Sequence, residues 1–279
     1  MTRSPKVRIV RNGLLYVSAL LLCGFSLFPI LWGISTSLKP QNKLYVQPPQ
    51  WIPDPVTLEH YASVFKNKAM MHYFFNTSMI AIGSTLFSII IGTLAAYGFS
   101  RFKFPGRDTL LWSILFTQIF PRVVIIIPFY VTLRNFQLLG TYTGLILVYL
   151  IVVLPISVWL LKGFIDNIPY EIEEAAIIDG CSILALLWRI VVPMTLPAIG
   201  AVAMYAFILS WNEFLFALVF SSTDTRTVSV GLAFFIDEVG VQWGQLMSSS
   251  ILMSIPAIVV FSLAQKLLVR GLSEGGVKG

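Results

Sequence analysis

Apolar residues run along this chain in long stretches, and short polar or basic segments separate each stretch from the next. A helix needs about 20 apolar residues to cross a bilayer, and the stretches are close to that length. The first stretch is longer than the apolar part of a signal peptide, so we expect it to stay as an uncleaved helix. The pattern predicts six transmembrane helices, at residues 12–38, 74–99, 110–133, 144–161, 198–220 and 246–268.

Prolines modify this pattern in two places. Pro121 and Pro128 lie inside the third stretch, which predicts a kink there. Residues 40–68 are polar and rich in proline, which favours an extended strap over a helix. From about residue 58 to 75, apolar and aromatic residues recur at mixed helical spacing and predict a short interfacial helix.

The segment 168–197 is the one long interruption with helical content of its own. Pro169 can open a helix, because a proline at the first helical position gives up an N–H that has no partner. Acidic residues follow in the first turns, where they favour the positive end of the helix dipole: Glu171, Glu173 and Glu174. Gly180 predicts the end of this helix. A second helix is expected from Ser182 to Ile190, with Pro193 and Pro197 breaking or kinking it.

Composition places the chain in a membrane. It has 279 residues, of which 57% are hydrophobic and only 11% charged, whereas soluble domains carry about 25% charged residues. The net charge of +6 comes from basic residues scattered between the apolar stretches, which is typical of topology determinants and not of a nucleic-acid surface. The two cysteines, Cys23 and Cys181, do not suggest a disulfide framework.

The basic residues also predict an orientation. With the N-terminus inside the cell, the inner segments hold twelve Lys and Arg and the outer segments hold six. Cytoplasmic loops of membrane proteins carry such an excess. We therefore expect both termini and the segment 168–197 on the cytoplasmic side.

No motif for enzymatic chemistry stands out. The chain contains no GxxxxGK[ST] phosphate-binding loop, no metal-ligand spacing and no GxSxG. We expect no ATPase site, no metal site and no bound cofactor in this chain.

Two ionisable residues fall inside predicted spans, where a charge is costly and usually faces a bundle interior or water. Glu213 follows Trp211 and Asn212, and an aromatic face beside an amide and a carboxylate suits a sugar or polyol. Arg122 is the second such residue. Both could line a substrate pathway. Alternatively, Glu213 pairs with a residue of a partner subunit, and Arg122 pairs with Glu213 or with a partner's carboxylate, or extends to the interface.

Segment 168–197 resembles the EAA loop of bacterial ABC-importer permeases. Glu174, Ala175 and Ala176 are followed by Asp179 and Gly180 and, after a further helix, by Pro193, at the spacing of that motif. The resemblance implies an all-α fold of the type I ABC importer permease, in which this helix–turn–helix couples the spans to an ATPase. We call residues 164–197 the EAA loop.

The wider chain is similar to MalG-type permeases of carbohydrate importers. Trp211 to Phe214 and the glycine-rich ending Gly275, Gly276, Val277, Lys278 and Gly279 carry this resemblance. It implies a bacterial or archaeal cell-membrane location, with a MalF-like second permease, a dimeric ABC ATPase that holds ATP and Mg²⁺, and an extracytoplasmic solute-binding protein as partners. It also implies that the tail reaches the ATPase. The domain plan is then a cytoplasmic N-terminus (1–11), a permease domain (12–268) and a cytoplasmic tail (269–279).

The function that these features predict is that of a permease subunit, which forms the membrane pathway of a sugar importer with a second permease. The EAA helices would move as levers when the ATPase dimer closes, with Glu174 anchoring the lever and Gly180 permitting its turn. An ABC permease for a non-sugar solute is one alternative. A secondary transporter without an ATPase is another, although internal repeats and several buried carboxylates are typical of that class and are not evident here.

Overall fold

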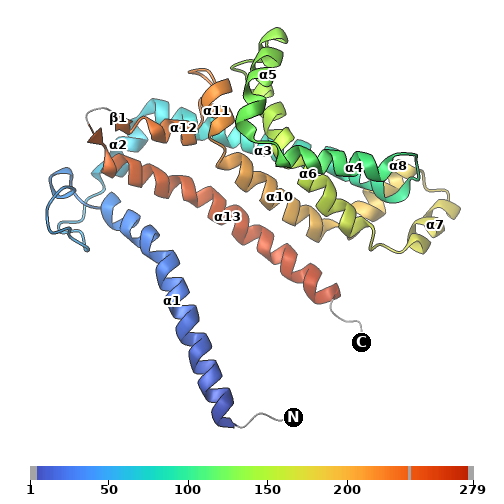
Figure 1. The fold of residues 1–279 in the computed structure, drawn as a ribbon, viewed down its shortest axis with the longest axis horizontal. Coiled ribbons are helices and arrows are strands. Elements are labelled where there is room, and N and C mark those ends of the chain that lie inside the picture. The colour runs from blue at the N-terminus through green and yellow to red at the C-terminus, as the bar shows by residue number, and fades with distance from the viewer. Residues whose placement is uncertain (1–4, 238–239, 276–279) are drawn as a thin grey trace. The chain divides into compact units, whose positions relative to one another are not determined.

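The computed structural model describes residues 5–237 and 240–275, with side chains described for 12–236 and 240–265. Helices make up most of the described chain, which confirms the all-α prediction (Figure 1). Its internal contacts divide it into two compact units. Unit 1 comprises Met1–Lys68 and Phe234–Leu252, and unit 2 comprises Ala69–Ala233 and Met253–Gly279.

Unit 1 consists of a long helix, a strap and a small ribbon. Its elements are α1 (Pro5–Ser37), η1 (Gln41–Lys43), α2 (Glu59–Lys66), β1 (Ile236–Asp237), β2 (Gly240–Val241) and the first turns of α13 (Trp243–Gly275). The two strands pair antiparallel, with Ile236 opposite Val241. The predicted interfacial helix is present as α2, and the strap before it has one short 3₁₀ turn and is otherwise non-helical.

Unit 2 holds most of the predicted spans and the EAA loop. Its elements are α3 (Lys68–Arg101), α4 (Arg107–Phe116), η2 (Thr117–Ile119), α5 (Arg122–Asn135), α6 (Tyr142–Ile165), α7 (Tyr170–Ile178), α8 (Ile183–Leu186), η3 (Leu187–Val191), α9 (Val192–Met194), α10 (Leu196–Trp211), α11 (Leu215–Phe220), α12 (Val228–Ala233) and the rest of α13. Within this unit, α7 and α8 lie at one end, and α11 and α12 lie toward the other (Figure 1).

Four of the described helices are long and apolar enough to cross a membrane: Asn12–Ser37, Lys68–Arg101, Tyr142–Ile165 and Trp243–Gln265. Two bent pairs bring the number to six. In the first, Arg107–Ile119 and Arg122–Asn135 meet at 104°. The sequence predicted a kink there, but the change of direction is a full break. Phe120 is extended and ends the preceding 3₁₀ turn, because the residue before a proline disfavours the helical conformation.

The fifth predicted span, 198–220, is also not one helix. The helix of the EAA loop, Ile183–Met194, meets Leu196–Trp211 at 80°. A second interruption follows at residues 212–214, before α11 begins. The 80° bend lies between Pro193 and Pro197, where the sequence predicted a break or kink. Hydropathy concealed the interruption at 212–214, since apolar residues flank it on each side.

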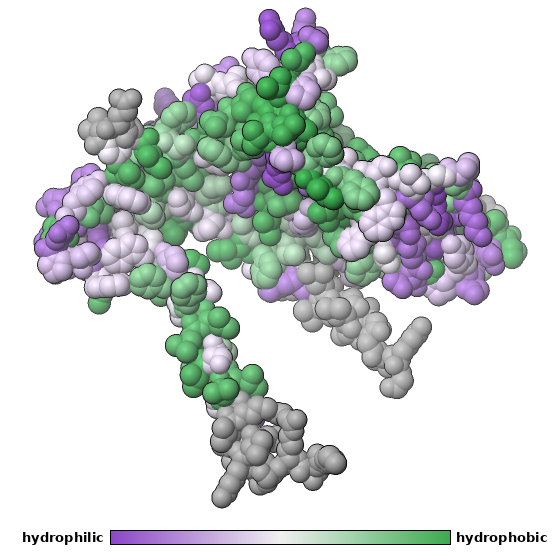
Figure 2. Space-filling model, viewed as in Figure 1, coloured by the Kyte–Doolittle hydropathy of each residue, from purple (hydrophilic) through white to green (hydrophobic). Residues whose placement is uncertain are grey.

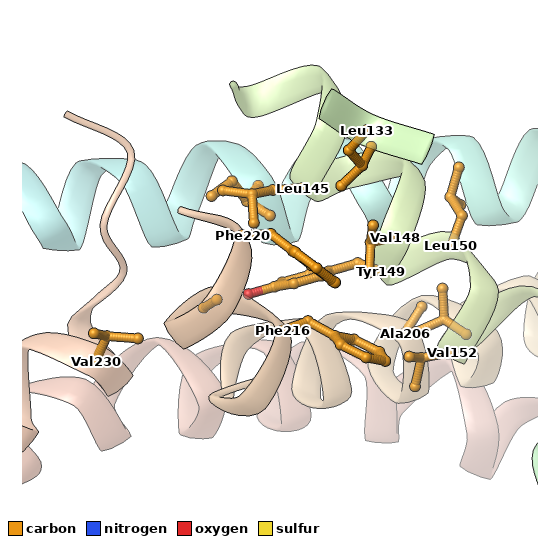
Figure 3. Close-up of a cluster of buried hydrophobic side chains, with 13 residues drawn as sticks. Leu133, Leu145, Val148, Tyr149, Leu150, Val152, Ala206, Phe216, Phe220 and Val230 are labelled. Atoms are coloured by element: carbon orange, nitrogen blue, oxygen red, sulfur yellow. The ribbon is translucent and has the colours of Figure 1, made fainter. Parts of the chain in front are cut away.

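A cluster of buried side chains packs α6 against α10 and α11. Figure 3 shows Tyr149 of α6 extending towards Phe216 and Phe220 of α11. All three are almost completely buried, and the rings of Phe216 and Phe220 stack with their centroids 5.7 Å apart. In a bilayer, van der Waals packing of this kind supplies much of the helix association.

Candidate functional site

The turn of the EAA loop is a Schellman motif, which ends α7. The Cys181 N–H donates to the Ala176 carbonyl at 2.9 Å, and the Gly180 N–H donates to the Ile177 carbonyl at 2.9 Å. Gly180 has a φ of +85°, which a residue with a Cβ adopts only at a cost. The prediction that Gly180 ends the helix is confirmed. At the other end, Pro169 is the N-cap, so α7 begins at Tyr170.

The second helix of the EAA loop is longer than predicted. Ser182 caps its start, where the side-chain oxygen accepts from the Ala185 N–H at 3.3 Å. The helix passes through the π-helical turn η3 without a break and continues to Met194, beyond the expected end at Ile190. Pro193 lies in this last turn, and the sharp bend follows it at Thr195. The helix thus ends one residue after Pro193, consistent with the predicted break or kink at this proline.

A buried ion pair fixes α7 to the end of α3. The Arg101 guanidinium contacts Glu173 Oε1 through Nε at 2.7 Å and through Nη2 at 2.6 Å. The Tyr97 hydroxyl donates to the other carboxylate oxygen, Oε2, at 3.1 Å. The Arg101 and Glu173 side chains are only 6% and 7% exposed. Removing either partner would leave a charge buried without its counter-ion.

The same guanidinium also holds the end of α6. Arg101 Nη2 donates to the carbonyls of Ile165 and Ile168, at 2.9 and 3.0 Å. The Tyr170 ring lies under the guanidinium, with 4.3 Å from Cζ to the ring centroid. One side chain therefore joins the ends of α3 and α6 to the start of α7.

A second connection between α3 and α6 lies beside the Arg101 guanidinium. The Ser100 hydroxyl donates to Asp166 Oδ1 at 2.6 Å, and Lys162 Nζ contacts Asp166 Oδ2 at 2.7 Å. Burial opposes ionisation of Asp166, but these two hydrogen bonds outweigh it and lower the pKa of the carboxyl below its ordinary value. The charged form of Asp166 thus strengthens the connection between α3 and α6.

The second helix of the EAA loop is fixed by apolar packing. Leu186, Leu187 and Val191 are buried against a cluster that includes Leu161 and Ile165 of α6. Both helices of the loop are therefore attached to the spans, the first by charge and the second by packing. A displacement applied to the loop would be transmitted to α3, α6 and α10.

The tip of the loop is exposed and largely apolar. Ile178 is 85% exposed, and its neighbours Ile177, Ile183 and Leu184 are all more than half exposed. Figure 2 shows hydrophilic residues gathered over the α7 end of unit 2, with hydrophobic ones among them. Exposed apolar residues with a polar rim are typical of a docking surface for a protein. We call Ile177, Ile178, Ile183 and Leu184 the apolar tip.

The residues predicted to carry coupling are mostly on the surface. Four of them are exposed along the first helix and its turn: Glu174, Ala175, Asp179 and Gly180. Ala176 is half-buried against the apolar cluster that holds the second helix, and Pro193 is exposed. One prediction needs correction, because Glu173 and not Glu174 anchors this helix within the chain. Glu174 is exposed and is available to a partner.

The residues predicted to line a pathway divide into two groups. Trp211 is 2% exposed, stacks on Phe207 and donates its indole N–H to the Met253 carbonyl at 2.9 Å. Glu213 is also buried, and its carboxylate accepts from the N–H groups of Phe216 and Ala217 at 3.0–3.2 Å, as an N-cap does. These two side chains are thus engaged in forming the break and starting α11.

Asn212 and Arg122 are exposed. Asn212 donates to the carbonyl of Ile208 and leaves its amide oxygen accessible, while Arg122 begins α5 immediately after the 104° break. Arg122 and Glu213 form no ion pair in the described part of the chain. Polar side chains at two helix breaks are available to a solute or a partner.

The tail is only partly visible. Gly275 is the last residue of α13, which therefore continues seven residues beyond the predicted end of the sixth span. Gly276, Val277, Lys278 and Gly279 lie outside the described residues.

Sequence reasoning missed Arg101, Tyr97 and Glu173 as a unit. Arg101 was counted only as a topology signal in a basic loop, and Glu173 as one of three acids at the start of a helix. Since Arg101 and Glu173 are 72 positions apart, no local pattern joins them. One available signal was that Arg101 directly ends an apolar stretch, where a charge that does not reach water needs a partner.

Comparison with known proteins places the chain among transport proteins. A family model described as "Binding-protein-dependent transport system inner membrane component" matches residues 88–274. The sulfoquinovosyl glycerol transport system permease protein SmoH of Agrobacterium fabrum is 34% identical over 265 residues, covering 95% of this chain and 93% of that protein. The trehalose/maltose transport system permease protein MalG of Thermococcus litoralis is 32% identical, covering 97% and 98%.

A solved structure shares the fold. It is the crystal structure of a bacterial ABC transporter involved in the import of the acidic polysaccharide alginate, with a TM-score of 0.81 and 22% identity. The match covers 95% of this chain and 99% of that chain. The predicted importer-permease fold is thereby confirmed.

Proposed function

Since the chain belongs to the binding-protein-dependent transport system inner membrane component family, we propose that it is the permease subunit of an ATP-driven importer for a sugar or a sugar-containing solute. Two relatives that align over almost their whole length are named for transport of sulfoquinovosyl glycerol and of trehalose or maltose. The sugar chemistry of these relatives supports a carbohydrate substrate here.

The proposed importer contains three further kinds of subunit. They are a second permease, a dimeric ABC ATPase that binds ATP and Mg²⁺, and an extracytoplasmic solute-binding protein. The family description names a binding-protein-dependent system, which supports the last of these. Both termini and the EAA loop face the cytoplasm in this proposal, and the two-to-one excess of basic residues supports that orientation.

The observation that carries the coupling proposal is an exposed tip on a firmly held hairpin. The apolar tip would insert into the ATPase, where removing its exposed surface from water favours binding. Glu174 and Asp179 flank it and would contact basic or N–H groups of the ATPase. Closure of the ATPase dimer on ATP would then displace the hairpin.

Attachment to the spans converts that displacement into gating. The Arg101–Glu173 pair holds α7 on α3, and the buried leucines of the second helix hold it on α6. The hairpin would therefore move as a lever and change the relation between the spans. The solute would pass along a surface that includes Asn212 and Arg122, each at a helix break. Trp211 and Glu213 shape the break at residues 212–214.

The test compares two charge reversals on the same helix. Glu174→Lys alters the flank of the apolar tip, whereas Glu171→Lys alters an exposed acid in the first turn. We expect Glu174→Lys to reduce ATP-dependent sugar uptake by the reconstituted importer at least tenfold, with Glu171→Lys near the wild-type rate. Both variants should keep normal amounts of protein in the membrane.

The outcome also decides between classes of transporter. If the purified chain moves solute without an ATPase, or if the two reversals have equal effects, the coupling proposal is wrong. If the importer is ATP-driven but no sugar binds to its solute-binding protein, only the carbohydrate substrate is wrong.

A further inference from the structure

A pocket with apolar walls and four polar side chains lies within unit 1, at the end of α1 away from the N-terminus. It has a volume of about 410 Å³, and its walls come from α1, the strap and the first turns of α13. Trp32 and Thr36 contribute from one face of α1, since residues four apart share a helix face. Trp243 and Met247 contribute from α13 in the same way.

Three polar groups in this pocket have no ordinary partner. Lys39 is 4% exposed, and its ammonium lies over the Trp32 ring at 4.3 Å from the centroid, with no carboxylate among the described ion pairs. The Thr36 hydroxyl and the Gln50 side-chain carbonyl are buried without a hydrogen-bond partner in the described part of the chain. Buried polar groups in proteins are nearly always satisfied, so a group from outside the chain is needed.

The sign of the missing group follows from the charges. Lys43 also lines the pocket, and no Asp or Glu is among its described lining residues. An ammonium removed from water without a counter-ion is costly, and burial lowers the pKa of Lys39. An anion that accepts hydrogen bonds from Lys39, Lys43 and the Thr36 hydroxyl would remove this cost.

The position of the pocket indicates the source of the anion. The candidate span of α1 ends at Ser37, only two residues before Lys39. Tryptophans are enriched at the level of the lipid head groups, and Trp32 and Trp243 border the pocket. On α1, Phe28 and Leu31 are exposed beside Trp32 and offer an apolar surface to an acyl chain.

We propose that this pocket binds the head group of an anionic phospholipid, with phosphatidylglycerol as the type that fits its donors and acceptors. The phosphate accepts from Lys39, Lys43 and Thr36, and a glycerol hydroxyl donates to the Gln50 carbonyl. A zwitterionic lipid brings the same phosphate together with a cationic amine, which the two lysines repel. Hydrogen bonds from an ammonium group to phosphate oxygens are among the strong, charge-assisted ones.

The experiment is native mass spectrometry of the full-length chain released from detergent, titrated with phosphatidylglycerol, phosphatidylcholine or inorganic phosphate. We expect phosphatidylglycerol to bind at least about tenfold more tightly than phosphatidylcholine. One hydrogen bond to a charged group changes a dissociation constant by about tenfold or more. Lys39→Met should abolish this preference. Lys66→Met removes the same charge from an exposed position of α2 in unit 1 and should leave it intact.

A second variant separates lipid binding from folding. Thr36→Val keeps the shape of the side chain and removes only the unpartnered hydroxyl, so it should fold and still weaken phosphatidylglycerol binding severalfold. Equal binding of both lipids, or a preference that survives Lys39→Met, would overturn the proposal. So would competition by inorganic phosphate as effective as that of the lipid, since the site would then take free phosphate. A further outcome would also overturn the proposal: Lys39→Met leaves lipid binding unchanged but no longer assembles with a companion subunit. The counter-ion of Lys39 would then belong to that subunit.

Discussion

Replacing Glu173 by alanine removes the carboxylate that ties α7 to α3. The Arg101 guanidinium then loses two contacts of 2.6–2.7 Å, and the Tyr97 hydroxyl loses its acceptor. Arg101 keeps the carbonyls of Ile165 and Ile168, which accept from Nη2. The positive charge thus stays buried with neutral partners only.

The size of the effect follows from the burial. Breaking a buried ion pair by removing one partner costs about 3–5 kcal/mol. Since two carbonyls still accept from Arg101, we expect Glu173→Ala to lie at the lower end, about 3 kcal/mol. Glu173→Gln keeps an acceptor and the shape of the side chain, and should cost about 1 kcal/mol. Glu174→Ala, which changes an exposed neighbour, should stay within about 0.5 kcal/mol.

Hydrogen exchange of the α7 amides measures this attachment directly, since the segment can detach without unfolding the spans. A loss of about 3 kcal/mol corresponds to a fall in protection of about two orders of magnitude. The fall should be confined to α7 and the adjoining ends of α3 and α6 in Glu173→Ala, with Glu174→Ala as the control. If α7 protection in Glu173→Ala stays within about threefold of wild type, the ion pair does not hold this helix.

Three further predictions concern local geometry and charge. Gly180→Ala should destabilise the turn by about 1 kcal/mol, because Gly180 has a φ of +85°, which alanine adopts only at a cost. Gly180→Asn should cost less, since asparagine tolerates this conformation better. Thermal unfolding of the purified chain measures both. Gly144→Ala should lower stability by about 1–3 kcal/mol in the same assay, since a Cβ there would overlap the carbonyl oxygen of Leu138. Asp166 has a lowered pKa, so its ion pair with Lys162 stabilises the fold above about pH 4 and is lost as the pH falls through the folded-state value. The difference in melting temperature between wild type and Asp166→Asn should therefore be small, because the pair is partly exposed, and should vanish only once the pH falls below the lowered pKa of Asp166 in the folded state.

The sequence was most informative where one residue type dictates the backbone. Pro169 and Gly180 predicted the limits of α7 to within one residue, because proline and glycine restrict or permit conformations locally. Pro121 predicted the change of direction in the third span, although not its angle of 104°. Apolar stretches predicted the four long helices, which run past the predicted limits at every end except the C-terminal end of α1.

Contacts between distant segments could not be predicted in this way. Three acids stand within four positions at the start of α7, and local spacing does not distinguish the one that meets Arg101. At residues 212–214, the buried Glu213 carboxylate starts a new helix, whereas hydropathy alone continued the span. The burial of Lys39 depends on the strap folding back against α1 and α13, which composition does not reveal.

The central claim is that the apolar tip of the EAA loop faces the cytoplasm and docks on an ATPase. The most direct measurement is labelling of a single cysteine placed at Ile178, the exposed residue that ends α7, after Cys23 and Cys181 are replaced by serine. A membrane-impermeant maleimide should leave this cysteine unlabelled in intact cells and should label it in inverted membrane vesicles stripped of ATPase. Adding the ATPase back to these vesicles should prevent the labelling. Labelling in intact cells, or labelling unaffected by the ATPase, would contradict the account.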